Sequence, residues 1–156
     1  MKEFVRNIYE EYRETFDDHL DIEDKQEVKS ESYVYEWYTI KTGKVFYVGK
    51  GTKDRYKHIL REIKTYENDP KKYKGKRWKE LQEAYGIDYR ILLKDLTDEE
   101  AQIMEMYYIA ERLKQRNPLL QFVIAWDSEL LDEEDYLYWK SVNYPPKGKT
   151  LIELFE

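Results

Sequence analysis

The 156-residue sequence predicts a single domain of the α/β class (α+β type), in which three strands are flanked by helices. Residues 33–40 and 45–49 are rich in aromatic and β-branched side chains, and the turn sequence between them is typical of a β-hairpin. Residues 87–96 predict a third strand, which we expect at the centre of the sheet because it is so apolar. Apolar residues at helical spacing around these strands predict the helices.

Two helices are predicted between the hairpin and the third strand. They cover residues 54–66 and 77–86, with a basic loop between them, and the second ends at Gly86, a typical C-cap. The apolar face of the first helix consists of Tyr56, Ile59, Leu60 and Ile63.

A longer helix follows the third strand. Thr97 and Glu100 match the S/T-x-x-E capping box and predict a helix over residues 97–116. Residues 117–126 form an apolar segment that is partly strand or loop, and residues 127–142 form an acidic helix. Residues 144–156 begin with a Pro-Pro break and end in a short apolar tail.

Helical additions are predicted at both ends of the single domain, which covers residues 1–156. Residues 1–30 combine an amphipathic helix with an acidic linker, and residues 122–156 form a C-terminal helical extension. The apolar face of the first helix repeats every four residues, at Phe4, Ile8, Tyr12 and Phe16.

The composition excludes several kinds of site. The chain has no cysteine, which rules out disulfides and thiolate zinc sites. It has only two histidines, so a metal site would depend mainly on carboxylates, which suits Mg²⁺ or Mn²⁺. No apolar run approaches the roughly 18 residues of a membrane span, and we expect a soluble, cytoplasmic protein.

Basic residues concentrate in the middle of an acidic chain. The net charge is −6, but residues 50–79 contain 12 Lys or Arg against 4 Asp or Glu. Such a local excess favours a polyanionic partner, although a solvated lysine-rich surface would look the same in sequence.

One carboxylate interrupts the apolar face of the helix that begins after Thr97. Glu105 lies at helical spacing with four apolar or aromatic residues, namely Ala101, Met104, Tyr108 and Ile109. A buried carboxylate is costly unless it is paired or binds a metal. Glu105 is therefore either an ion-paired residue at the edge of the stripe or a metal ligand.

Polar groups also gather where the hairpin ends. Lys50 and Arg55 follow the second strand, and His58 shares a helix face with Arg55. Glycines 49 and 51 allow the backbone to approach a ligand closely, and we interpret them as clearance for a DNA backbone. Tyr35 and Tyr47, on adjacent strands, are either core residues or phenols that hold a proton.

These residues together resemble the GIY-YIG nuclease family. Residues 33–35 and 47–49 resemble its paired hairpin motifs, although Tyr33 and Val34 stand where the family name has Gly and Ile. Lys50 matches a family lysine directly after the second motif, and Arg55 matches an arginine in GKGxxxR spacing. His58 matches a histidine one turn later, and Glu105 matches a glutamate in a "LTDEEAQIMEMYYI" helix. The resemblance covers roughly residues 33–121. The sequence departs from the family at an asparagine that often follows a proline after the glutamate helix: Asn117 precedes the proline here and Gln121 follows it, and whether either takes this part is open.

The resemblance implies a small three-stranded antiparallel sheet flanked by helices, and a DNA endonuclease that uses one divalent cation. Glu105 would bind Mg²⁺ or Mn²⁺, and Arg55 would stabilise the phosphate charge. Lys50 would contact phosphate or lower a tyrosine pKa. Any of Tyr35, Tyr47 or His58 would be the general base. The products would carry 5′-phosphate and 3′-hydroxyl ends.

DNA is the expected partner, and a homodimer is an open possibility. The basic residues expected to follow the DNA backbone are Lys53, Lys57, Arg61, Lys64, Lys76 and Arg77. Trp78, Tyr66 and Tyr73 lie among them and would either stack on bases or pack in the core. The alternatives to a nuclease are an inactive nucleic-acid-binding domain of the same fold and a protein-interaction module.

Overall fold

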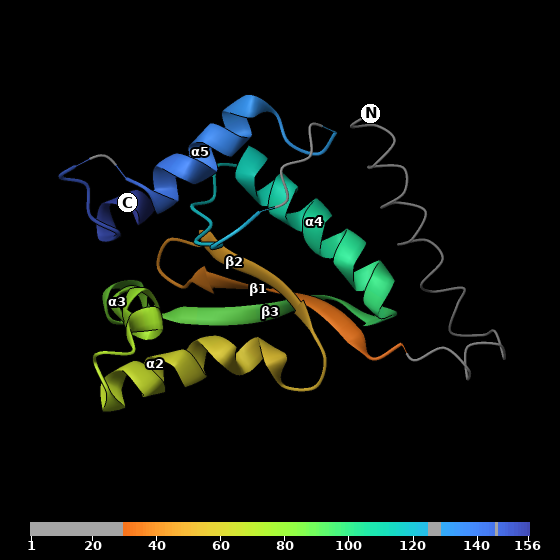
Figure 1. Ribbon diagram of the computed structural model, residues 1–156, viewed down its shortest axis with the longest axis horizontal. Helices are drawn as coiled ribbons and strands as arrows, with labels where there is room; N and C mark the ends of the chain where they lie inside the picture. Colours follow the sequence, from red (N-terminus) through yellow and green to blue (C-terminus); the bar gives the residue numbers. More distant parts are fainter. Residues whose placement is uncertain (1–29, 125–128, 146) are drawn as a thin grey trace, which may run out of the picture.

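The computed structural model describes residues 30–124, 129–145 and 147–156. In this part of the chain, a three-stranded antiparallel sheet and four α-helices confirm the predicted α+β class (Figure 1). The predicted helix and linker of residues 1–30 lie outside the described residues, apart from Ser30. None of the helices described is long and apolar enough to cross a membrane.

The central strand is β1, not β3. The strands are Ser32–Thr39 (β1), Val45–Gly51 (β2) and Ile87–Leu96 (β3), in the order β2-β1-β3. The prediction that residues 87–96 form the central strand is therefore wrong. All of β1 is buried except Tyr38, whereas most of β3 is exposed or half-buried. The apolar side chains of β3 contribute to the hydrophobic clusters on both faces of the sheet. An edge strand can do this as well as a central one, so the apolar sequence does not require a hydrogen-bonded strand on each side of β3.

The predicted hairpin is confirmed, and it contains a β-bulge. Trp37 and Tyr38 of β1 pair with Tyr47 and Val45 of β2, so Phe46 is an extra residue in β2. Phe46 and Tyr47 consequently lie on the same side of the sheet, where both rings contact one tryptophan of α3. A bulge of this kind changes the direction of the side chains beside it.

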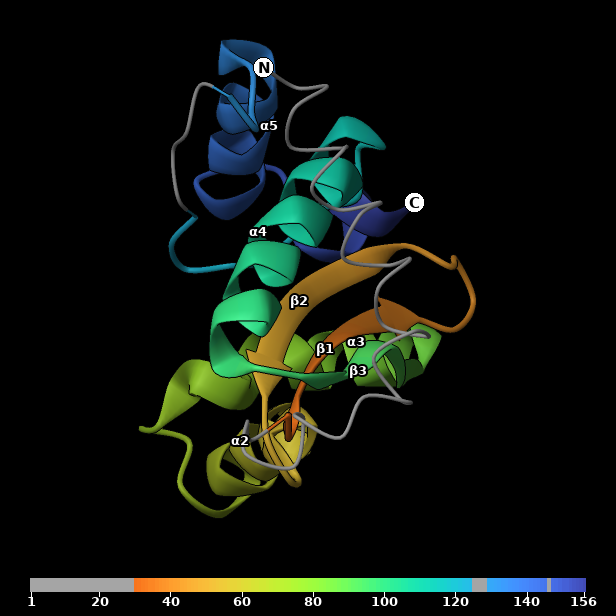
Figure 2. The same cartoon turned by 90° about the vertical axis from the view of Figure 1, so that its right-hand side faces the viewer.

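Helices cover both faces of the sheet (Figures 1 and 2). The helices α2 (His58–Asn68) and α3 (Lys76–Tyr85) lie on one side, and α4 (Asp98–Lys114) and α5 (Glu133–Asn143) lie on the other. The predicted C-cap at Gly86 and the capping box at Thr97 are both present. Alternate residues of β1 divide between the two cores, with Val34 facing α4 and Tyr35 facing α2.

The C-terminal residues contribute to both cores. Trp139 of α5 is buried with the α4 cluster, whereas Val142 and Phe155 are buried with the cluster on the opposite side. A short 3₁₀ helix, Ile152–Phe155, places the Phe155 ring 6.4 Å from the ring of Phe46. The described part of the C-terminal extension is therefore packed onto the sheet.

The free edge of β2 is covered by an irregular segment rather than by a strand. Residues 115–124, after α4, contain no helix or strand. Four hydrogen bonds join this segment to β2: Val45 N to Asn117 Oδ1 (2.9 Å), Leu120 N to Phe46 O (2.7 Å), Val48 N to Gln121 Oε1 (2.9 Å) and Gln121 Nε2 to Val48 O (2.8 Å). Both candidate amides are thus committed to the strand edge, which satisfies its unpaired backbone groups.

Candidate active site

The two predicted tyrosines lie together on the hairpin. The ring centroids of Tyr35 and Tyr47 are 6.2 Å apart, and both rings lie on the side of the sheet that α2 covers. Gly49 pairs with Tyr35 across the hairpin. A Cβ atom at Gly49 would lie 2.6 Å from the Tyr35 hydroxyl and 2.9 Å from Cε1 of Tyr47. This glycine therefore makes room for the two phenols, and the interpretation of glycine 49 as clearance for DNA is wrong.

The start of α2 brings a histidine and an arginine to these phenols. The His58 ring centroid lies 4.9 Å from that of Tyr47 and 6.1 Å from that of Tyr35. Arg55, in the 3₁₀ turn before α2, is exposed and acts electrostatically on both tyrosines. Its Cβ and Cγ atoms fill the space beside Gly51, so this glycine makes room for Arg55 and not for a DNA backbone.

Glu105 reaches the same place from the opposite face of the sheet. It is half-buried on α4, which packs against β2, and its charge raises the pKa values of Tyr35 and Tyr47. Burial raises the pKa of Glu105 itself, while the Lys50 ammonium and backbone N–H lower it. The segment that covers the edge of β2 bonds to Val45, Phe46 and Val48, so groups from both faces of the sheet can meet around the following residues, 49–51. All six predicted catalytic residues lie around this end of β2; they are Tyr35, Tyr47, Lys50, Arg55, His58 and Glu105.

Both phenols are held in the neutral form. Burial is the main reason why the pKa values of Tyr35 and Tyr47 are raised, and it outweighs the lowering effect of Arg55. A phenol with a raised pKa donates a hydrogen bond at neutral pH but does not act as an anionic base without another group to take its proton.

A carboxylate missed in the sequence, Glu62, holds His58 in place. Its Oε1 lies 3.6 Å from Nδ1 of His58, and its Oε2 accepts a 2.6 Å hydrogen bond from Nε1 of Trp78. Burial alone would raise the pKa of Glu62, but the contacts with His58 and Trp78 outweigh burial and lower it. The i, i+4 spacing from His58 to Glu62 was the sequence signal that could have identified this pair.

The other nitrogen of His58 faces the interior without a partner. His58 is 7% exposed, and its Nε2 atom is buried with no hydrogen-bond partner among the described residues. A neutral imidazole whose Nδ1 carries the proton has an acceptor lone pair at Nε2. The contact with Glu62 therefore leaves Nε2 available as a proton acceptor beside the two phenols.

The predicted basic residues do not form one surface. Lys50 forms a 2.8 Å ion pair with Asp98, next to the site. Three of the predicted DNA contacts lie on the face of α2 opposite the buried Ile59 and Ile63, and they do not join the site; these are Lys57, Arg61 and Lys64. Arg61 also pairs with Asp54.

The remaining predicted contacts have separate surroundings. Lys53 is exposed in the turn before α2, with its backbone at φ 52° and its carbonyl accepting a 2.9 Å hydrogen bond from the Tyr33 hydroxyl. Lys76 is exposed at the start of α3. Arg77 is half-buried and donates to the Leu120 carbonyl (3.3 Å), so its guanidinium has a structural role. Of the aromatic residues among these charges, Trp78 is a core residue, at 1% exposed.

The possible metal ligands of the site fit a cation that is bound jointly by the protein and a substrate. Among the described residues, no group of three His, Asp or Glu side chains could enclose a metal ion. Glu105 is a half-buried carboxylate that forms no ion pair with the described cations, and Lys50 pairs with Asp98 instead. Mg²⁺ commonly binds in this way, through one or two carboxylates, several waters and the oxygens of a substrate phosphate.

Comparison of the chain with protein-family models, curated proteins and solved structures finds no match.

Proposed function

We propose that the protein is a divalent-metal-dependent DNA endonuclease that hydrolyses phosphodiester bonds to 5′-phosphate and 3′-hydroxyl ends. The observation that supports this most is that Glu105, on a helix at the other face of the sheet, acts electrostatically on Tyr35 and Tyr47, the same two phenols that Arg55 and His58 approach. A carboxylate, an arginine, two phenols and an imidazole acceptor are the groups that hydrolysis of a phosphodiester needs.

Glu105 would hold the Mg²⁺ or Mn²⁺ ion, together with water and a DNA phosphate. When bound, the cation supplies Lewis-acid polarisation of the phosphate and stabilises the leaving oxygen. Lys50 lies close enough to lower the pKa of Glu105 and so favours the ionised carboxylate that a metal requires.

Arg55 would bind the non-bridging phosphate oxygens. Its guanidinium is exposed, and it forms no ion pair with the described acidic residues, so it is available to an anion. An arginine that contacts these oxygens stabilises the charge that develops in the transition state.

His58 would accept the proton of the attacking water through Tyr47, whose ring lies against the imidazole, because Nε2 of His58 is buried. The raised pKa values of the phenols suit them to donate hydrogen bonds that orient the water, and the acceptor nitrogen of His58 is the partner that such a proton needs. The two neutral phenols and the imidazole thus divide the tasks of positioning and proton transfer.

A plasmid-nicking assay with Mg²⁺ or Mn²⁺ tests this proposal. We expect Glu105→Gln and Arg55→Ala each to reduce nicking by about 100-fold or more, as for loss of one charge-stabilising group. Glu99→Gln, on the exposed side of the same helix, and Lys94→Ala, on β3, are the matched controls and should retain activity. DNA ligase should reseal the nicks, because it joins only 5′-phosphate to 3′-hydroxyl ends.

The assay also distinguishes the alternatives. DNA binding without cleavage would identify an inactive nucleic-acid-binding domain. Neither binding nor cleavage would favour a protein-interaction module. Equal activity of wild type and Glu105→Gln would contradict the catalytic assignment.

A further inference from the structure

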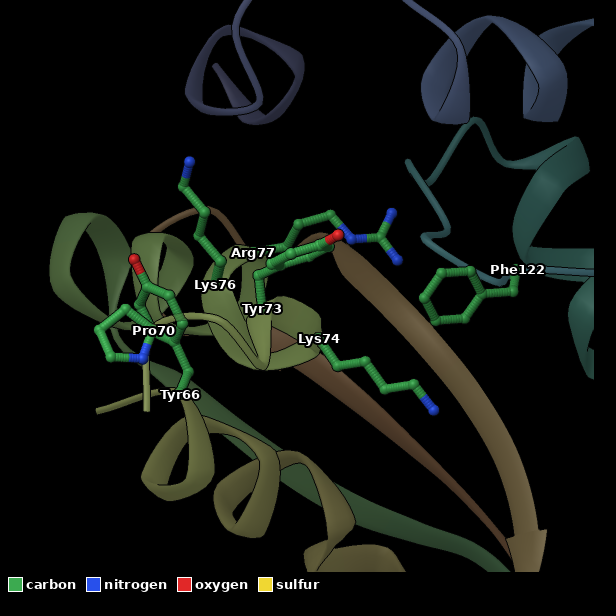
Figure 3. A pocket seen from close by; sticks show the side chains of 7 residues that line it. All are labelled: Tyr66, Pro70, Tyr73, Lys74, Lys76, Arg77 and Phe122. Carbon is green, nitrogen blue, oxygen red and sulfur yellow. The ribbon is translucent and has the colours of Figure 1, made fainter. Parts of the chain in front are cut away.

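A pocket with aromatic and basic walls lies between the end of α2 and the start of α3, with Phe122 at one side (Figure 3). We call it the α3 pocket; it has a volume of about 520 Å³ and is lined by Tyr66, Pro70, Tyr73, Lys74, Lys76, Arg77 and Phe122. A second hollow of about 420 Å³ shares Tyr73 and Lys74 with it and is also lined by Lys71 and Lys72. These volumes are in the range of pockets that bind small organic groups.

We propose that the α3 pocket binds an unpaired nucleotide, with its base stacked on Tyr73 and Phe122 and its phosphates held by the surrounding lysines. This inference rests on the proposed function, because it identifies the DNA that the nuclease would bind: a strand with unpaired nucleotides next to the cleavage point.

The aromatic walls are available for stacking. Tyr73 is 71% exposed and Phe122 is 63% exposed, and they come from segments far apart in the sequence. The guanidinium carbon of Arg77 lies 4.9 Å from the centre of the Phe122 ring, which holds that ring at one side of the pocket. Bases in a duplex are already stacked on each other, so exposed rings in a pocket favour an unpaired base.

The charge around the pocket is complementary to a phosphate backbone. Lys71, Lys72, Lys74 and Lys76 are all exposed and lie within six residues of sequence. In the described part of the chain, none of the four side chains forms an ion pair. The single acidic residue that lines either hollow is Glu62, and its carboxylate is already bonded to Trp78. An acidic ligand without an aromatic ring would leave the rings without a partner. A neutral apolar ligand would leave the lysines without one.

Two sets of contacts connect the pocket to the active site. Gly75 packs so closely on the α2 backbone at Glu62 that a Cβ atom there would overlap the Glu62 carbonyl. Glu62 in turn contacts His58, so one residue lines the second hollow and orients the candidate base. On the other side, Arg77 donates to the Leu120 carbonyl, and Leu120 is bonded to Phe46 of β2. An unpaired nucleotide in the pocket would therefore fix the position of the strand that enters the site.

Fluorescence anisotropy with a labelled eight-nucleotide oligothymidylate tests the pocket, in EDTA so that no cleavage occurs. We expect Tyr73→Ala and Phe122→Ala each to weaken single-strand binding by roughly 5- to 100-fold, as for loss of one stacked base. Tyr73→Phe should bind as wild type does. Lys74→Ala should reduce the slope of log binding constant against log salt concentration by about 1, as for loss of one phosphate contact. The control is Tyr144→Ala, an equally exposed ring (69%) outside the pocket.

Unchanged binding in both ring variants would overturn the proposal, as would equal weakening by Tyr144→Ala or an absence of single-strand binding. The failure of the proposed function has a different signature. If plasmid nicking is absent but Tyr73→Ala and Phe122→Ala weaken oligothymidylate binding, then the pocket stands and the nuclease assignment fails. If wild type nicks DNA and the ring variants bind normally, then the nuclease assignment stands and the pocket fails.

Discussion

Oε1 of Glu62 lies 3.6 Å from Nδ1 of His58, one turn earlier on α2, and this contact orients the imidazole toward the rings of Tyr35 and Tyr47. The second oxygen of Glu62 is fixed by Nε1 of Trp78, which is itself buried. The orientation of His58 therefore depends on a core residue of a different helix.

Replacement of Glu62 should impair catalysis through His58. In Glu62→Gln one of the two oxygens becomes an NH₂ donor, so the side chain no longer offers one oxygen to Nε1 of Trp78 and the other to Nδ1 of His58. We expect nicking to fall by about 10- to 100-fold, as for loss of a group that orients a catalytic histidine. The pH profile of the rate should also shift, because the environment of His58 changes. Glu67→Gln, exposed on the same helix, is the control. A rate and a pH profile like those of wild type would show that Glu62 does not position His58.

Gly49→Ala should disturb both phenols. The added methyl group would lie 2.6 Å from the Tyr35 hydroxyl, so the ring must move. Overpacking of this kind destabilises a protein by about 1–3 kcal/mol. We expect a lower urea midpoint, a changed near-ultraviolet circular dichroism spectrum and a large loss of nicking. A variant with the stability and activity of wild type would contradict the close packing of Gly49 on Tyr35.

Glu36 should be important for stability but not for chemistry. This buried carboxylate on β1 is 1% exposed and pairs with Arg112 of α4 (2.7 Å) and Arg90 of β3 (3.1 Å). Loss of the hydrogen bonds to such a charged group costs about 1.5–3 kcal/mol, less than for a fully buried pair because Arg90 and Arg112 are 49% and 18% exposed. We expect Glu36→Ala to lower the free energy of unfolding in urea by this amount. Glu83→Gln, exposed on α3, is the control and should change it by less than about 0.5 kcal/mol.

Stability should fall in acid partly because of Asp135. Burial would raise the pKa of this α5 carboxyl, but hydrogen bonds from Lys114 (2.8 Å) and Arg116 (2.9 Å) outweigh burial and lower it. The stabilisation is therefore complete above the unfolded pKa of 3.8 and is lost as the pH falls through the lower folded value. Urea unfolding at several pH values below 6 should show that the free energy of unfolding falls less steeply with decreasing pH in Asp135→Asn than in wild type. An identical slope would mean that Asp135 titrates alike in both states.

Local sequence signals predicted the hairpin and the helix ends well. The turn between β1 and β2, the capping box at Thr97 and the C-cap at Gly86 depend on residues close in sequence, and all three are present. The place of β3 could not be predicted in the same way. An apolar strand packs equally well at the centre or at an edge, and its hydrogen-bond partners are set by distant residues.

Site residues that belong to a sequence motif could be predicted. Residues that matter only because of a contact with a distant part of the chain could not. Tyr47 and Glu105 were identified from the sequence and lie near each other in the structure. Neither Glu36 nor the covering of β2 by residues 117–121 had a local signal, because their partners are more than 50 residues away. Lys57, Arg61 and Lys64 lie on the exposed side of the chain at α2, away from the core, and their contacts with DNA stay a prediction.

The amide-covered edge of β2 limits how two copies of the chain could associate. Strand addition from another molecule at this edge would first have to displace the hydrogen bonds that Asn117, Leu120 and Gln121 make to β2. Gln121 is 6% exposed, so this displacement would also open the protein interior. A homodimer would therefore have to use a different surface, and the edge that helps to form the candidate site is protected from intermolecular β-pairing.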